Sequence, residues 1–177
     1  MRILVSGGSA SGKSKHAEDL TVALCKPKQP LYYIATMIPY GAEAQERIER
    51  HRLLRLDKGF ETVECYQSSN MPDLPAQAVV LLECVGNMLA NEMYLDESFD
   101  PQRAQDVLRA INALASTVEH LIVVTNDIAS DGIVYDEDTK VYQRQIGYIN
   151  QNLAAWFDKV VEVVCSIPLV HKQSDAM

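Results

Sequence analysis

A glycine-rich stretch near the start of the chain has the residue types and the spacing of a phosphate-binding loop. Residues 7–14 match the pattern G-x-x-x-x-G-K-[ST] at every defined position. The stretch consists of Gly7, Gly8, Ser9, Ala10, Ser11, Gly12, Lys13 and Ser14. Glycines let the backbone N–H groups of such a loop turn toward phosphate oxygens, which larger side chains would obstruct. We therefore expect this loop to bind a nucleoside triphosphate.

The residue types also assign roles around the bound phosphates. Lys13 is expected to reach the β- and γ-phosphates as a point charge, and Ser14 to give its hydroxyl to Mg²⁺. A second metal ligand should come from an acid at the end of a strand, where open α/β sheets bind their ligands. Glu83 and Asp127 each follow an apolar run. Glu83 is the preferred candidate and Asp127 the second.

A basic segment stands out in this acidic protein. Around His51 it carries Arg47, Arg50, Arg52 and Arg55. The arginines could clamp a triphosphate, or they could form a solvated helical face paired with interleaved glutamates, and spacing alone favours the solvated face. His51 is a candidate of another kind, because a neutral imidazole can attack phosphorus and form a phosphoramidate without first losing a proton.

The elements that would position these residues can be read from short apolar runs without polar alternation. These runs are Ile3–Val5, Leu31–Ala35, Thr62–Cys65, Ala78–Leu82, Leu121–Thr125 and Val160–Cys165. They are typical of strands buried on both faces of a mostly parallel sheet. Helical apolar spacing follows Ser14, covers residues 104–118, and places Tyr142, Ile146, Ile149, Leu153, Trp156 and Phe157 on one face. We predict an α/β fold, with a mostly parallel sheet flanked by helices, of the RecA-like P-loop NTPase class.

Length and composition narrow the class of protein. A chain of 177 residues, 47% hydrophobic and 23% charged, fits a single P-loop nucleotide-binding domain over residues 1–177. The net charge of −8 argues against a nucleic-acid partner. We expect no membrane span, no signal peptide and a cytoplasmic location. The four cysteines lack C-x-x-C spacing, which argues against a zinc site or a disulfide framework.

Longer segments carry a more specific resemblance than the loop does. They include GGSASGKSKHAE, LYYIAT, ERIERHRLLR, LLECVGNMLANEMY and VVTNDIASDGIVYDEDTKVYQRQIGYINQNLAAW. With these segments the chain resembles, almost end to end, the bifunctional adenosylcobinamide kinase / adenosylcobinamide-phosphate guanylyltransferases of cobalamin biosynthesis. The resemblance implies phosphorylation of adenosylcobinamide with ATP or GTP. It also implies transfer of GMP from GTP to adenosylcobinamide phosphate through a guanylylated histidine, giving adenosyl-GDP-cobinamide.

The resemblance also implies site residues and partners. It makes His51 the guanylylated residue, and it implies a corrinoid substrate and a homotrimer. Besides the loop, the nucleotide contacts that it implies are Ala35, Thr36, Met37, Arg52, Leu53, Leu54, Arg55, Glu64 and Glu83. Glu64 could accept from the guanine N1 and N2 donors, which adenine lacks. The chain departs from the common family pattern at Ala10, where many members carry arginine, and over residues 55–60, where R-P-x-x-W is missing.

Two other functions fit the loop. Another small P-loop kinase, acting on a metabolite or nucleotide, would use Lys13 and Ser14 but would not need His51. A nucleotide-dependent switch would hydrolyse slowly and change partners, but the sequence has no long polar segment or exposed partner helix of the kind that such a protein uses.

Overall fold

The core of the protein is one seven-stranded sheet. The computed structural model describes residues 1–94, 102–128, 132–133 and 135–174, without the side chains of Glu43, Arg47 and Leu54. The strand order is β3-β2-β4-β5-β1-β6-β7, and all neighbours are parallel except β6 and β7. The strands are β1 Arg2–Ser6, β2 Leu31–Ala35, β3 Glu61–Glu64, β4 Val79–Glu83, β5 His120–Val124, β6 Lys159–Val164 and β7 Ile167–Gln173.

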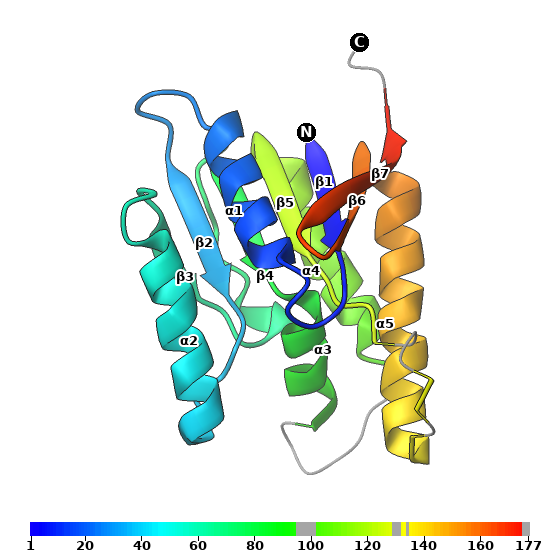
Figure 1. Cartoon of the computed structure of the whole chain (residues 1–177). Helices are drawn as coiled ribbons and strands as arrows, with labels where there is room; N and C mark the ends of the chain where they lie inside the picture. The colour runs from blue at the N-terminus through cyan, green and yellow to red at the C-terminus, as the bar shows by residue number, and fades with distance from the viewer. Residues whose placement is uncertain (95–101, 129–131, 134, 175–177) are drawn as a thin grey trace.

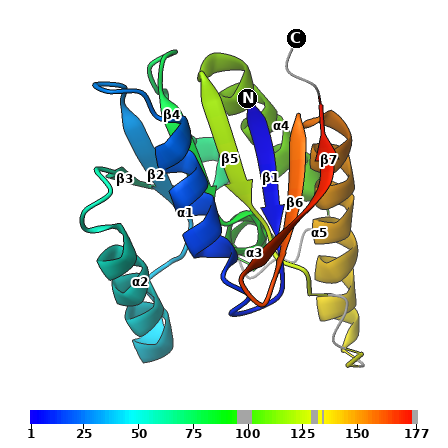
Figure 2. The same cartoon turned by 45° about the horizontal axis from the view of Figure 1, so that its top comes forward.

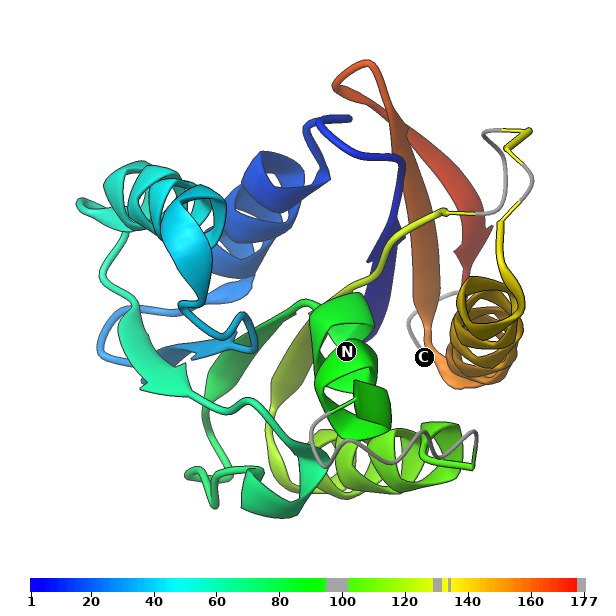
Figure 3. The same cartoon turned by 90° about the horizontal axis from the view of Figure 1, so that it is seen from below.

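Helices cover both faces of the sheet (Figures 1 and 3). The helices are α1 Lys13–Leu24, α2 Gly41–Arg55, α3 Val85–Tyr94, α4 Ala104–Thr117 and α5 Glu137–Trp156, with a short 3-10 helix at Ser68–Asn70. Helix α1 packs against one face through Ala17 and Leu20, whereas α3, α4 and α5 bury a separate apolar cluster on the other face. Helix α2 lies on the same side of the sheet as α1 but is displaced toward the carboxyl ends of the strands (Figures 1 and 3).

The strands that should carry the site end at one edge of the sheet (Figure 2). Ala35 of β2 pairs in register with Glu83 of β4, and Glu83 pairs with Val124 of β5. Val124 in turn pairs with Val5 of β1, just before the glycine-rich loop. Because parallel strands bring their carboxyl ends together, the loop and Glu83 meet at this edge.

Most of the predicted architecture is confirmed. The six predicted runs are the strands β1–β6, and the sheet is mostly parallel and flanked by helices. The sequence did not predict α3, β7 or the short 3-10 helix at Ser68–Asn70. Trp156 is 48% exposed, so its placement on the buried face of α5 was wrong, although Leu153 and Phe157 are fully buried. None of the helices in the described residues combines the length and the apolar character that a membrane span needs.

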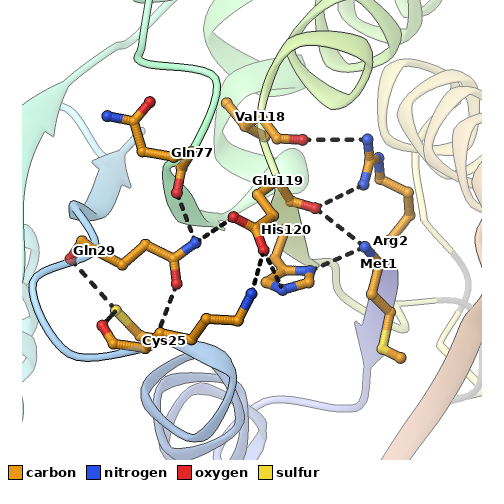
Figure 4. A network of polar contacts seen from close by, with 9 residues as sticks. Met1, Arg2, Cys25, Gln29, Gln77, Val118, Glu119 and His120 are labelled. Atoms are coloured by element: carbon orange, nitrogen blue, oxygen red, sulfur yellow. Dashed lines mark hydrogen bonds and ion pairs between the residues drawn. The ribbon is translucent and has the colours of Figure 1, made fainter.

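A polar network ties the opposite edge of the sheet together (Figure 4). The N-terminal ammonium group donates to the Glu119 carbonyl (3.1 Å) and lies 3.0 Å from His120 Nδ1. The Arg2 guanidinium donates to the same carbonyl (3.1 Å). The Glu119 carboxylate accepts from Lys26 (2.8 Å) and from Gln29 (2.7 Å). The network fixes the amino ends of β1 and β5, far from the glycine-rich loop.

Candidate active site

The glycine-rich loop connects β1 to α1 and is supported from behind by later parts of the chain. Gly12 adopts a left-handed conformation (φ 91°) at the N-cap of α1. The Ser166 N–H, in the turn between β6 and β7, donates to the Ser11 carbonyl (2.8 Å). The Asp127 N–H donates to the Gly7 carbonyl (3.2 Å). These bonds occupy the Gly7 and Ser11 carbonyls, and within the loop the Ser11 N–H donates to the Gly8 carbonyl (3.3 Å), so an anion would be bound by the other loop amides.

Glu83 is the centre of the polar contacts at this edge. Its carboxylate, 7% exposed, accepts hydrogen bonds from the Ser14 hydroxyl and from the Tyr33 phenol (3.0 Å). The nearest His51 nitrogen, Nδ1, lies 3.5 Å from the same carboxylate. Burial raises the pKa of the Tyr33 phenol well above its usual value, and the Glu83 charge adds to this effect. Tyr33 is therefore a fixed donor that orients the carboxylate.

Helix α2 presents its basic residues in two different settings. Arg52 is exposed and lies 4.0 Å from Glu64, whose other oxygen accepts from the Tyr66 phenol (2.6 Å). Arg55 is only 7% exposed, with its guanidinium carbon 3.5 Å from the Tyr33 ring centroid. The Arg55 Nη1 atom is buried without a hydrogen-bond partner among the described residues. The solvated-face interpretation fits Arg52 but not Arg55, whose free donor suits an anion.

Most of the predicted side chains line one pocket of about 480 Å³ between α2 and the carboxyl ends of the strands. These are Lys13, Ser14, Ala35, Thr36, Met37, His51, Arg52, Arg55, Glu64 and Glu83. A second pocket, of about 620 Å³, lies over the loop and is lined by Ser9, Ala10, Ser11, Gly12, Lys13, Ser14 and His51, among others. His51 and the first turn of α1 line both pockets. The imidazole is thus adjacent to the phosphate loop.

Some predicted residues lie elsewhere. Leu53 is 60% exposed and lies outside both pockets, because it is two residues from His51 and therefore points away from it on the helix. The side chain of Leu54 lies outside the described part. Asp127 lines neither of these two pockets, whereas Glu83 lines the first of them. Glu83 is therefore the better placed of the two acids to act as a metal ligand.

The sequence interpretation missed several polar groups in the first pocket. Tyr33, Tyr66, Asn87 and Asn126 all line it. Tyr33 lies within the second predicted strand, and its alternation with Ile34 indicated opposite faces but not a contact with Glu83. Asn126 directly follows a predicted strand, which is the same signal that identified Glu83.

Comparison with known proteins agrees with this geometry. Residues 3–171 match the family described as cobinamide kinase / cobinamide phosphate guanyltransferase. The bifunctional adenosylcobalamin biosynthesis protein CobU of Escherichia coli K12 is 36% identical over 182 residues, covering 94% of this chain and 97% of that protein. CobU of Salmonella typhimurium is 34% identical with the same coverage. CobP of Pseudomonas aeruginosa is 27% identical, with 96% of each chain covered.

Solved structures support the fold alone. An ATPase domain superposes with a TM-score of 0.57 at 8% identity, covering 99% of this chain and 78% of that one. The flagellar accessory protein FlaH of Methanocaldococcus jannaschii gives 0.55 at 9% identity, with 98% and 78% covered. The predicted P-loop NTPase fold is confirmed, and so is the family resemblance. The chain belongs to the cobinamide kinase / cobinamide phosphate guanyltransferase family of enzymes.

Proposed function

We propose that this protein phosphorylates adenosylcobinamide with ATP or GTP and then transfers GMP from GTP to adenosylcobinamide phosphate, with His51 as the guanylylated residue. The observation that carries the proposal is the position of His51. Its ring lines both the pocket over the phosphate loop and the pocket at the strand ends, and lies 3.5 Å from Glu83. A single domain over residues 1–177 would then serve both reactions.

The transfer proceeds in two displacements. An imidazole lone pair of His51 attacks the α-phosphorus of GTP, and a P–N bond forms as the bond to pyrophosphate breaks. Lys13 and the loop amides stabilise the charge that develops on the phosphate oxygens. A phosphate oxygen of adenosylcobinamide phosphate then attacks the same phosphorus, and the electron pair of the P–N bond returns to the ring. In the kinase reaction the oxygen of the corrinoid hydroxyl attacks the γ-phosphorus next to Lys13. The bond from that phosphorus to the bridging oxygen breaks, the nucleoside diphosphate leaves, and the hydroxyl proton passes to solvent.

The site fits Mg²⁺. The Ser14 hydroxyl and the Glu83 carboxylate are hydrogen-bonded to each other and would supply two oxygen ligands. Among the described residues, no group of three acid, histidine or cysteine side chains forms a complete protein site. This donor set suits Mg²⁺, which binds few protein oxygens together with substrate phosphates and water. When bound, the ion would neutralise part of the triphosphate charge.

Guanine selection is assigned to Glu64. Its carboxylate is held between Arg52 and the Tyr66 phenol at the wall of the first pocket. A carboxylate there can accept from guanine N1 and N2, and rejects a base that lacks these donors. Glu64→Gln should reduce the preference for GTP over ATP in the transfer reaction. An unchanged preference would remove Glu64 from this role.

We also propose a homotrimeric assembly in the cytoplasm, as the resemblance implies. Exposed apolar side chains on β7 (Ile167, Leu169 and Val170) offer a surface that a neighbouring subunit could cover. Light scattering on the purified protein measures the assembly state, and a monomer at micromolar concentration would contradict this part.

The test of the main proposal is trapping of the covalent intermediate. Protein incubated with α-labelled GTP should keep label through denaturation and lose it in acid, as a phosphoramidate does. His51→Ala should abolish labelling, whereas His171→Ala, at an exposed histidine of β7, should not. If the wild-type protein has kinase activity but is not labelled, the transfer reaction is excluded, and the competing function, a small P-loop kinase without the transfer step, is supported.

A further inference from the structure

Helix α2 is joined to the rest of the protein by a row of basic side chains near its C-terminal end. His51 faces Glu83, Arg55 lies over Tyr33, and Lys58 follows in the turn after the helix. Their spacing of four and three residues places them on one side. The Lys58 N–H donates to the Arg55 carbonyl (2.9 Å), so the turn that carries Lys58 continues directly from the helix.

Lys58 is anchored on α1 by two acids. Its ammonium group lies 2.9 Å from Glu18 Oε2 and 2.7 Å from Asp19 Oδ1. The two acids differ in their surroundings, because the Glu18 side chain is fully buried whereas that of Asp19 is 45% exposed. Glu18 lies four residues after Ser14 and so on the same side of α1.

The Glu18 carboxylate depends on this lysine. Its second oxygen is buried without a hydrogen-bond partner in the described part of the chain. Burial raises the pKa of the Glu18 carboxyl, and the hydrogen bond and charge of Lys58 oppose that shift. A buried acid that is hydrogen-bonded to a cation costs free energy when that partner is removed, so the pair fixes the separation of the two helices more firmly than an exposed ion pair can.

We propose that Lys58 and Glu18 form a positioning clamp that holds the C-terminal end of α2 on α1 and thereby keeps His51 over the phosphate loop. The inference rests on the proposed guanylyl transfer. Attack on phosphorus requires the ring nitrogen within about 3–3.5 Å of it, and a displacement of about 1 Å can cost on the order of 100-fold in rate. Phosphorylation of the corrinoid hydroxyl does not use His51, so the clamp should affect one reaction and spare the other.

The experiment compares four variants, Lys58→Met, Lys58→Arg, Glu18→Gln and Asp19→Asn. For each, the rate of His51 guanylylation, the kinase rate and the Kd for GTP are measured on one preparation. Lys58→Met and Glu18→Gln should slow guanylylation on the order of 10- to 100-fold, with the kinase rate and Kd changed by less than about threefold. Lys58→Arg should restore most of the rate. Asp19→Asn, at the exposed partner, should stay within about twofold of wild type.

Hydrogen exchange over α2 supplies a readout that does not depend on the transfer reaction. Lys58→Met should accelerate exchange of the α2 amides and leave those of α4 unchanged. Equal losses of both activities, or unchanged guanylylation and α2 exchange in Lys58→Met, would overturn the clamp. If the wild-type protein forms no guanylyl-histidine, the proposed function fails instead, and α2 exchange alone then decides whether the clamp exists.

Discussion

Gly12→Ala tests whether the turn after β6 shapes the phosphate loop. Gly12 has φ 91°, and a Cβ atom there would lie 2.6 Å from Ser166 Oγ and 3.2 Å from Ser166 Cα. A left-handed backbone costs a non-glycine residue about 1–2 kcal/mol. Crowding against a packed neighbour adds about 1–3 kcal/mol, toward the low end here because the Ser166 hydroxyl can rotate. We expect the free energy of unfolding to fall by about 2–4 kcal/mol.

Urea denaturation followed by circular dichroism measures this change, and a titration with GTP measures the accompanying loss of affinity. Gly8→Ala is the matched control, since a Cβ there meets nothing within 4 Å, and its stability should stay within about 0.5 kcal/mol of wild type. Ser166→Gly removes the Oγ and Cβ atoms of that residue and leaves its Cα atom in place. In a double-mutant cycle it should therefore recover most of the crowding part of the Gly12→Ala loss but not the backbone strain. Equal effects at Gly12 and Gly8, or a cycle without coupling, would refute the reasoning.

Three further outcomes follow from individual contacts. Tyr33→Phe removes the buried donor to the Glu83 carboxylate and should lower the free energy of unfolding by about 1.5–3 kcal/mol. Urea denaturation measures this change. An unchanged midpoint of urea unfolding would mean that the hydrogen bond is not formed. Asp136→Ala removes the side chain that caps α5 and should lower stability by about 1 kcal/mol, measured by thermal denaturation; no change would contradict the cap. Burial raises the pKa of the Cys65 thiol to about 11. At pH 8 a disulfide reagent should therefore modify the exposed Cys165 first and should react with Cys65 only when the protein unfolds. Early labelling of Cys65 would contradict its burial.

The fold was predictable where local signals agree with the final packing. The runs Ile3–Val5 and Ala78–Leu82 are apolar because both of their faces are covered. The loop motif correctly predicted a strand before the loop and a helix after it, and these are β1 and α1. Strand β7 escaped prediction because its side chains are mostly exposed on both faces, so it carries neither a buried run nor alternation. Helix α3 begins at Val85, and only Cys84 separates it from the strand end at Glu83, so no glycine or proline marks the boundary between the two elements.

The candidate site was predictable residue by residue, but its internal contacts were not. The loop motif identified Lys13, the position at a strand end identified Glu83, and the family resemblance identified His51. The hydrogen bond from Tyr33 to Glu83 depends on the pairing of β2 with β4. The order of strands in the sheet cannot be read from the spacing of residues in the sequence. The basic segment shows the same limit, because spacing did not reveal that Arg55 would be buried and Arg52 exposed.

The contacts that hold the phosphate loop in place affect when the nucleotide site can form during synthesis of the chain. Residues 7–12 precede Ser166 along the chain by most of its length, and β1 pairs with β5 and β6, which also come late. A growing polypeptide therefore has no finished nucleotide cradle until its final strands have left the ribosome. During synthesis the glycine-rich segment should be open to proteases and unable to gain stability from GTP, so that the ligand can protect only the completed molecule.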